Sequence, residues 1–597
     1  MMDLLSWTPE YFSANEAACV AHLNTPEVRA QIPLLNCAQL HDLRDNMLVR
    51  FRGMIQDMQD PECYLESYEV RKKNDDTLVR VQNGKYRDVL VMNRDQESVD
   101  FKSPSNKYGE RRSMFVISIP GFNKWAIECE QKMCPNVGEK LQDKSVVTSN
   151  AKRPHEEEME TDNVSENEHV FKKPMLPSEP SEGSSKAITP KECKHALLSA
   201  QYLLNSPISE RPSKACLVKL YTDIDESTLN TVVDIVGFLS VDPALDGSTD
   251  QVEDFDDEMT EHQATHPPPS LIPRIHSISI QKLHHINPLI QNSSEAQLDN
   301  IDIWRDIHNL MTQCLFGDKV AADYLLCHLI STVYVRNDVE SLGQFSLNIS
   351  NIPADVLPIY TQAFYEILEL LLPASHYFPM TLENMNTVQF VPKKDYTTNK
   401  LTSGLLQLAP HTHLVLDETR LQTGKLESSG VEAVQSVAHL IRTQKLKYDF
   451  KFYHLEFNSD VPTLVLSEGK SMLPTNCYLP LIPDLDATKL IEETIKAGKH
   501  YIQPKLDAMR KFLTMQRIQE FDMKSFDPAI VQDEFVRMRR QCDASSDDLH
   551  SLLVLARLIG LCRGKKMLDQ DSWDHARLLE EERRNRVEMF TKRKSEM

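Results

Sequence analysis

Residues 413–418 have the sequence HLVLDE, a mostly apolar run that ends in two adjacent carboxylates. A run of this kind, bounded by helical segments, predicts a strand. Around it, strands are predicted at 344–350, 449–457 and 462–467, and helices at 355–372, 400–408 and 431–446. This alternation is typical of an α/β domain, which we expect over residues 291–485.

The same segment has the form of the Walker B strand of P-loop ATPases, whose Asp holds magnesium and whose Glu polarises the attacking water. That chemistry also needs a phosphate-binding loop, GxxxxGK[ST], and the sequence contains none. Residues 315–326 (LFGDKVAADYLL) stand where this loop and its helix would, but they are too poor in glycine. Residues 468–471 (EGKS) follow the Walker B-like strand instead of preceding it. We therefore predict that Asp417 and Glu418 are vestigial, with no catalytic residue and no cofactor.

Two strand-like segments in the first half of the chain share a pattern, at 47–58 and 231–241. When Gly53 is aligned with Gly237, apolar residues alternate around both glycines, and an Asp-Pro pair follows each segment. A glycine within an alternating strand suits the bend of a small closed barrel such as an OB-fold. The pattern predicts either two OB-like units or one barrel interrupted by a linker.

Composition marks two breaks in the chain. A disordered linker is expected at 126–205, because its central part is rich in Ser, Glu, Lys and Pro and cannot bury enough apolar area to offset its ordering entropy. An acidic cluster followed by three prolines predicts an extended insertion at 244–270. The expected parts are an N-terminal helical segment with an OB-like β domain at 1–125, the linker, a second OB-like unit at 206–290, the α/β domain at 291–485 and a helical domain at 486–597.

The linker holds two short basic clusters, Lys152 with Arg153 and Lys172 with Lys173, each followed by Pro. Their arrangement fits a bipartite nuclear-import signal, and it fits ordinary solvated charge equally well. Both interpretations stay open at this point.

Charge narrows the class of partner. The net charge is −22, with 88 acidic against 66 basic residues. A protein whose main task is to hold nucleic acid needs a net basic surface, so the balance favours protein partners. No apolar run approaches the ~18 residues of a membrane span, and MMDLLSWTPEYF is not a signal peptide, so we expect no membrane partner. Twelve cysteines without a CxxC pair predict reduced thiols and no metal site.

The last hundred residues carry a helical pattern. Leucines and other apolar residues between 549 and 559 form a stripe at helical spacing, preceded by the N-cap candidates Ser545 and Ser546. A second helix is expected after Gly564, with Trp573 on its apolar face. The pattern predicts a helical hairpin.

Several segments together resemble the MCM-binding protein (mini-chromosome maintenance complex-binding protein) family. They are FRGMIQDMQDPE (51–62), GKYRDV (84–89), ACLVKLY (215–221), FLSVDP (238–243), PSLIPRIH (269–276), QKLHHINPL (281–289), HLISTVY (328–334), MTLENMN (380–386), SGLLQL (403–408), LDET (416–419) and SEGKSMLP (467–474). The C-terminal hairpin also looks like the lid of MCM helicase subunits. The resemblance implies a multidomain α+β and α/β chain, with an OB-like N-terminal half, a degenerate AAA+-like (MCM-like) domain lacking a P-loop, and a lid-like helical bundle.

The resemblance implies a nuclear, non-enzymatic partner of MCM helicase subunits, in a subcomplex that lacks one member. It further implies roles in MCM assembly, stability or unloading, in DNA replication and in sister-chromatid cohesion, with indirect chromatin association and no small-molecule substrate. Two alternatives remain. One is a divergent AAA+ ATPase that uses Asp417 and Glu418. The other is a single-stranded DNA-binding protein that uses Arg50, Arg52 and Tyr64 of the OB-like strands, although acidic residues surround them.

Overall fold

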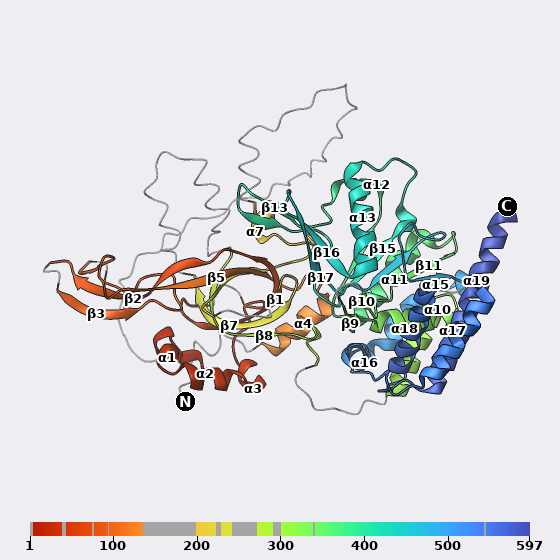
Figure 1. Ribbon diagram of the computed structural model, residues 1–597, viewed down its shortest axis with the longest axis horizontal. Coiled ribbons are helices and arrows are strands. Elements are labelled where there is room, and N and C mark those ends of the chain that lie inside the picture. Colours follow the sequence, from red (N-terminus) through yellow and green to blue (C-terminus); the bar gives the residue numbers. More distant parts are fainter. Residues whose placement is uncertain are drawn as a thin grey trace, which may run out of the picture.

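The computed structural model describes residues 4–38, 43–74, 77–93, 95–134, 199–222, 228–241, 271–290, 300–337, 341–542 and 545–596. Figure 1 shows a β-barrel with a protruding arm at one end of the molecule and an α/β body that ends in packed helices at the other. The expectation of a mixed α/β chain is confirmed. Most of the predicted linker, the insertion at 244–270 and the basic residues Lys152, Arg153, Lys172 and Lys173 lie outside the described residues.

Five strands close the barrel. They are β1 (Leu48–Met58), β5 (Lys107–Ile117), β6 (Ala215–Leu220), β7 (Val232–Ser240) and β8 (Arg274–Lys282). Around the barrel the order is β1-β7-β8-β6-β5, and β5 pairs back with β1. Neighbouring strands are antiparallel, except for β6 and β8, which are parallel. Closure of the circuit leaves no unpaired barrel edge.

The two strands with the shared glycine pattern are neighbours in this barrel. In the antiparallel register of β1 and β7, Val49 lies opposite Gly237 and Gly53 lies opposite Val233. The strands predicted in 1–125 and in 206–290 therefore form one barrel and not two. Both glycines are required by close packing, because a Cβ at Gly53 would lie 2.2 Å from the carbonyl oxygen of Ile117, and one at Gly237 would lie 2.3 Å from that of His276.

An arm extends from the barrel, at the left of Figure 1. It consists of β2 (Glu62–Lys72), β3 (Leu78–Asn83) and β4 (Glu97–Val99). β2 pairs with β3, with β4 and with the first half of β5. Short helices lie beside the barrel: α1 (Pro9–Ala14), α2 (Glu16–Leu23) and α3 (Pro26–Arg29). Trp7 and Phe12 of this N-terminal segment are buried in a cluster with Phe238 of β7.

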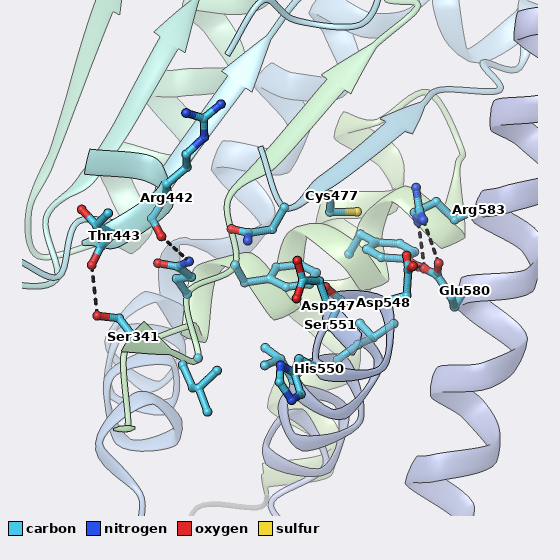
Figure 2. Close-up of a pocket in the computed structure, with 18 of the residues that line it drawn as sticks. Ser341, Arg442, Thr443, Cys477, Asp547, Asp548, His550, Ser551, Glu580 and Arg583 are labelled. Atoms are coloured by element: carbon cyan, nitrogen blue, oxygen red, sulfur yellow. Dashed lines mark hydrogen bonds and ion pairs between the residues drawn. The ribbon is translucent and has the colours of Figure 1, made fainter. Parts of the chain in front are cut away.

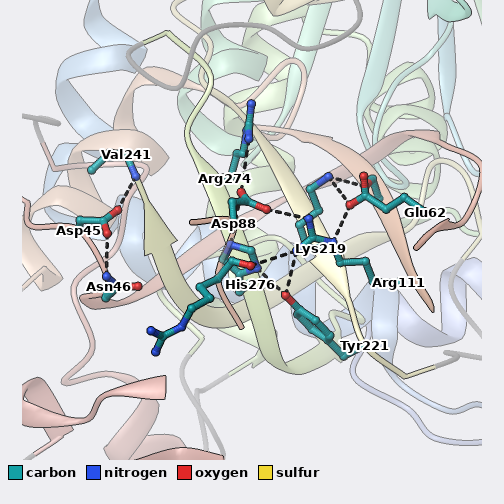
Figure 3. Close-up of polar contacts among 12 residues, drawn as sticks. Asp45, Asn46, Glu62, Asp88, Arg111, Lys219, Tyr221, Val241, Arg274 and His276 are labelled. Atoms are coloured by element: carbon teal, nitrogen blue, oxygen red, sulfur yellow. Dashed lines mark hydrogen bonds and ion pairs between the residues drawn. The ribbon is translucent and has the colours of Figure 1, made fainter. Parts of the chain in front are cut away.

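A polar network ties the arm to the barrel wall (Figure 3). The Asp88 carboxylate lies 2.8 Å from Arg111 Nη2 and 3.4 Å from His276 Nε2. Glu62 Oε1 lies 2.6 Å from both Arg111 Nε and Lys219 Nζ. Burial acts to raise the pKa of Asp88, but its contact with His276 and the charges of Arg111 and Lys219 outweigh it and hold that pKa well below its ordinary value. The network is therefore an ionised cluster that fixes the loop after β3.

The α/β body contains a five-stranded parallel sheet in the order β12-β15-β18-β11-β19. The HLVLD segment forms β15, which is buried along its whole length, so the strand predicted at 413–418 is confirmed. The strands are β11 (Leu347–Ser350), β12 (Ser375–Pro379), β15 (His413–Asp417), β18 (Thr463–Leu466) and β19 (Cys477–Pro480). The helices α11 (Leu357–Leu371) and α13 (Ser428–Thr443) connect strands of this sheet.

Helices from both ends of the second half pack together. The first pair, α9 (Asn300–Cys314) and α10 (Lys319–Ile330), shares one core with the C-terminal helices, so the packing crosses the boundary predicted at 485. The C-terminal helices are α14 (Leu485–Lys489), α15 (Ile491–Ile502), α16 (Leu506–Ile518), α17 (Pro528–Cys542), α18 (Ser546–Cys562) and α19 (Gln570–Glu596). Ser545 and Asp548 form a reciprocal capping box at the start of α18, as the N-cap prediction required.

A second, four-stranded sheet has the order β14-β13-β16-β17. Its strands are β13 (Lys393–Asp395), β14 (Lys400–Thr402), β16 (Lys445–Asp449) and β17 (His454–Asn458). The short helix predicted at 400–408 is wrong, and the strand predicted at 449–457 is confirmed only from residue 454 onward. Residues 400–402 pair with β13 instead, and 450–453 form the turn of the β16–β17 hairpin.

Buried polar contacts join the barrel to the α/β body. Asn123, just before α4 (Lys124–Met133), donates from Nδ2 to the carbonyl oxygen of Leu372 at 2.8 Å, and Trp125 Nε1 donates to the same oxygen at 2.8 Å. The remaining short elements are α7 (Ala200–Leu204), β9 (Val335–Arg336), β10 (Ser341–Leu342), α12 (Leu382–Thr387) and the 3₁₀ turns Leu4–Ser6, Glu418–Arg420 and Gln503–Lys505. The two parts are thus held as one packed unit.

Candidate functional site

The Asp417 carboxylate lies at the carboxyl end of β15 and is completely buried. Its Oδ1 accepts hydrogen bonds from the backbone N–H of Thr419 at 3.1 Å and from the Thr419 hydroxyl. Its Oδ2 accepts from the Tyr377 hydroxyl and lies 3.4 Å from Arg420 Nε. Burial, together with the bond to Asp417, raises the pKa of Tyr377 to about 12, so this hydroxyl stays protonated. The chain's own donors thus occupy the carboxylate.

The Glu418 carboxylate also accepts hydrogen bonds from other residues of the chain. It accepts from the Ser471 hydroxyl and from the backbone N–H of Met472, the latter at 3.3 Å. Burial raises the pKa of Glu418 above its ordinary value. The structure therefore brings the EGKS segment (468–471) next to Glu418, where it holds the loop after β18.

The turn that corresponds in position to a phosphate-binding loop is not the one predicted. Residues 315–326 span the turn between α9 and α10 and do not connect a strand to a helix, so the prediction that they occupy the P-loop position is wrong. The strand-to-helix turn at the carboxyl edge of the parallel sheet is formed by residues 351–356 (NIPADV), between β11 and α11. A P-loop is a turn of this kind, in which backbone N–H groups surround phosphate.

The 351–356 turn lacks the features that a phosphate cradle needs. It has no glycine, and Pro353 and Pro358 have no backbone N–H to donate. Asn351 lies in the left-handed region (φ 61°), and its Nδ2 donates to the carbonyl oxygen of Leu481 at 2.9 Å. The predicted strand at 344–350 directly followed by a helix at 355–372 was the signal that could have located this turn.

Because the 351–356 turn has no glycine and the sequence contains no GxxxxGK[ST] loop, we expect the Glu418→Gln variant to leave ATP turnover unchanged. Its rate should equal that of the wild-type chain, and both should equal a no-protein control in a coupled phosphate-release assay. A wild-type rate above the control that disappears in Glu418→Gln would contradict this and restore the ATPase alternative.

The residues that the DNA-binding alternative would use make contacts with other side chains of the protein. Arg50 pairs with Asp234, and Arg52 pairs with Glu130. The Arg111 guanidinium lies 5.4 Å from the centre of the Tyr64 ring. These side chains do not form the open row of stacking and basic groups that single-stranded nucleic acid needs, and the structure gives this alternative no support.

A cavity lies at the opposite edge of the sheet. Figure 2 shows a cavity of about 500 Å³ near Cys477, at the amino end of β19, lined also by Arg442, Asp548 and Arg583. Arg583 is held by Glu580, with Nη2 2.7 Å from Oε1. Burial raises the pKa of Cys477 to about 12, so this thiol is not a nucleophile at neutral pH. Ligands of open parallel sheets bind outside the carboxyl ends of the strands, and this cavity lies at the opposite edge.

The described ranges contain neither a metal-binding cluster nor a membrane-spanning helix. The His, Cys, Asp and Glu side chains there form no group of three that could hold a metal ion. No helix in the described part of the chain is both long and apolar enough to cross a membrane.

The barrel, the parallel sheet and the helical bundle together define a multidomain α/β protein whose described residues contain no P-loop site. Residues 19–587 match the family described as mini-chromosome maintenance replisome factor. A Drosophila melanogaster protein named mini-chromosome maintenance complex-binding protein is 46% identical over 100% of this chain and 99% of its own length. Proteins of the same name from Rattus norvegicus and Homo sapiens are 37% and 36% identical, each over 93% of this chain and 91% of the relative.

The chain therefore belongs to the mini-chromosome maintenance complex-binding protein family. The resemblance found in the sequence segments is confirmed. The family is named for binding and not for catalysis.

Proposed function

We propose that this chain is a non-enzymatic binding partner of the MCM replicative helicase complex. The observation that carries the proposal is the family match over residues 19–587. The proline-containing turn at 351–356 supports it, because a partner that recognises MCM subunits by shape needs no nucleotide turnover. The internal bonds of Asp417 and Glu418 are consistent with a structural use of both carboxylates.

The proposal includes an MCM-like architecture. When the barrel strands are numbered along the chain, their circular order is 1-2-3-5-4, with strands 3 and 5 parallel, as in an OB-fold. The parallel sheet has the order 2-3-4-1-5 in chain numbering, with the Walker B-like strand third, which supports a degenerate AAA+-like core. The α18–α19 hairpin would then be the lid-like part. A chain of this shape can pack against MCM subunits as subunits pack against each other.

The finer role follows from this likeness. We infer action in MCM assembly, stability or unloading from chromatin, and through it in DNA replication and sister-chromatid cohesion. A subunit-shaped chain would bind a subcomplex that lacks one member, because it would occupy the missing member's place. Its location would be the nucleus, and its chromatin association would be indirect, through MCM.

Affinity purification of the tagged full-length chain from nuclear extract, without added nucleotide, tests the proposal. We expect mass spectrometry to identify several MCM subunits in near-stoichiometric amounts, with one member depleted. A tagged scrambled-sequence bait is the control. Recovery of MCM subunits no higher than with that control would refute the proposed function.

A further inference from the structure

Strand β17 is an edge strand of the four-stranded sheet. Hydrogen-bonded pairs alternate along an antiparallel ladder. At one end of the β16–β17 hairpin, Phe450 N–H donates to the Tyr453 carbonyl oxygen at 3.0 Å. At the other end, Ser459 N–H donates to the Gln444 carbonyl oxygen at 2.9 Å. These two bonds determine which residues of β17 form backbone hydrogen bonds with β16.

The alternation makes Leu455 and Phe457 the residues that exchange backbone bonds with β16. The backbone N–H and C=O groups of His454, Glu456 and Asn458 are then directed away from β16. Among the described residues, no strand pairs with this outer side of β17. An edge of this kind is a template for an added strand.

The hairpin turn beside this edge carries exposed aromatic side chains. Phe452 and Tyr453 are 79% and 52% exposed, and Tyr396 of the neighbouring turn between β13 and β14 is 50% exposed. They are held in place, because the Tyr453 ring stacks on Phe450 at 5.1 Å and the Tyr396 hydroxyl donates to the Phe450 carbonyl oxygen at 2.9 Å. Preorganised aromatic side chains are the usual anchors of protein interfaces.

The charge of this sheet is opposite to that of the whole chain. Segments 389–402 and 442–458 contain seven Lys and Arg against three Asp and Glu, whereas the chain has 66 against 88. Lys447 and Lys451 are exposed on the hairpin itself. The surface therefore complements an acidic partner.

The edge continues into the cavity of Figure 2. Lys445 of β16 and Glu456 of β17 line that cavity together with Arg442. An extended segment along β17 would thus have the aromatic turn near one end and the cavity near the other.

We propose that the outer edge of β17 binds an extended, Asp- and Glu-rich segment of an MCM subunit, which pairs with it as an additional strand. Backbone bonds to His454, Glu456 and Asn458 supply affinity, the aromatic turn anchors one end, and the lysines select for acidic side chains. The identity of the partner rests on the proposed function, whereas the edge, the aromatic turn and the charge do not.

A pair of variants at one position separates backbone pairing from side-chain effects. Glu456→Pro removes the outward N–H without removing an inward ladder bond, and proline is tolerated on the free side of an edge strand. Glu456→Ala keeps the N–H and is the matched control. With purified MCM subcomplex and the full-length chain, we expect at least tenfold weaker binding for Glu456→Pro and a change within twofold for Glu456→Ala.

Charge reversal and crosslinking complete the test. Lys447→Glu with Lys451→Glu should weaken binding at least tenfold, and Lys489→Glu with Lys496→Glu, on exposed faces of α14 and α15, should change it within twofold. A photo-crosslinking amino acid in place of Phe452 should attach to an acidic MCM segment after nuclease treatment.

The outcomes distinguish the two proposals. If wild-type chain and all variants recover MCM equally, the edge inference is overturned and the proposed function stands. If the wild-type chain recovers no MCM, the proposed function fails and this partner assignment fails with it. Crosslinks to nucleic acid instead of protein would overturn the inference in favour of a nucleic-acid site.

Discussion

Asp234→Ala is expected to lower the stability of the barrel by about 3–5 kcal/mol, the range for breaking a buried ion pair from one side. Asp234 is a buried residue of β7 whose carboxylate accepts from Arg50 Nε of β1 at 2.8 and 2.9 Å. Arg29 of α3 lies 3.5 Å away and is equally buried. Burial acts to raise the pKa of Asp234, but Arg50 and Arg29 lower it below its ordinary value. The variant would leave the buried guanidinium of Arg29 and the partly buried guanidinium of Arg50 without this carboxylate.

Hydrogen exchange followed by mass spectrometry would measure this loss locally, in peptides from β1 and β7. We expect faster exchange there and also in α3, because Arg29 of that helix loses its ion pair with the Asp234 carboxylate. Asp302→Ala is the matched control, since its ion pair with Arg305 is exposed and worth at most about 1 kcal/mol. Protection of β1 unchanged by Asp234→Ala would show that the buried pair does not stabilise the barrel.

Mild acid is expected to destabilise the α/β body steeply. Burial lowers the pKa of both His328 and His376 to about 4, with Arg517 and Arg211 respectively adding to the shift. Both side chains are therefore neutral in the folded chain, while the unfolded chain binds a proton at about pH 6.5. Stability is then complete above that pH and falls as the pH drops from about 6.5 toward 4. Each histidine contributes a slope of up to about 1.4 kcal/mol per pH unit in this window.

Urea unfolding between pH 7 and pH 4.5, followed by tryptophan fluorescence, would measure this slope. His376→Phe removes one titrating group and should reduce the slope by about 1 kcal/mol per pH unit. His500→Gln, at an exposed position of α15, should leave the slope unchanged. An equal slope in the wild-type chain and in His376→Phe would mean that the imidazole of His376 is not kept neutral by folding.

Local pattern was sufficient for some elements and misleading for others. The strand at 413–418 and the helix at 355–372 follow from short-range apolar spacing, and the structure has both as β15 and α11. The structure of residues 400–408 does not follow from local spacing, because 400–402 become a strand only by pairing with 393–395. The exposed aromatic turn at 450–453 was absorbed into a predicted strand, because aromatic residues favour strands wherever burial is not known.

In the candidate site, too, some features follow from the sequence and others only from the tertiary structure. The absence of a GxxxxGK[ST] loop is a property of the sequence itself, and so is the pair Asp417 and Glu418. The position in the fold where such a loop would lie cannot be found from the sequence, because it depends on which strand of the sheet each helix follows. Only the sheet order puts 351–356 at the carboxyl edge and 315–326 between two helices.

By itself, the sequence determined the family, the α/β alternation, the helical C-terminus and the lack of a phosphate cradle, because each depends on residue types at short separation. The tertiary structure alone decided that β1 and β7 share one barrel, although about 170 residues separate them along the chain. It alone showed that α9 and α10 pack with the C-terminal helices, and that β17 lies at the edge of its sheet among the described strands. Strand pairing and exposure are set by contacts between residues far apart in sequence, and local periodicity does not encode which segments meet.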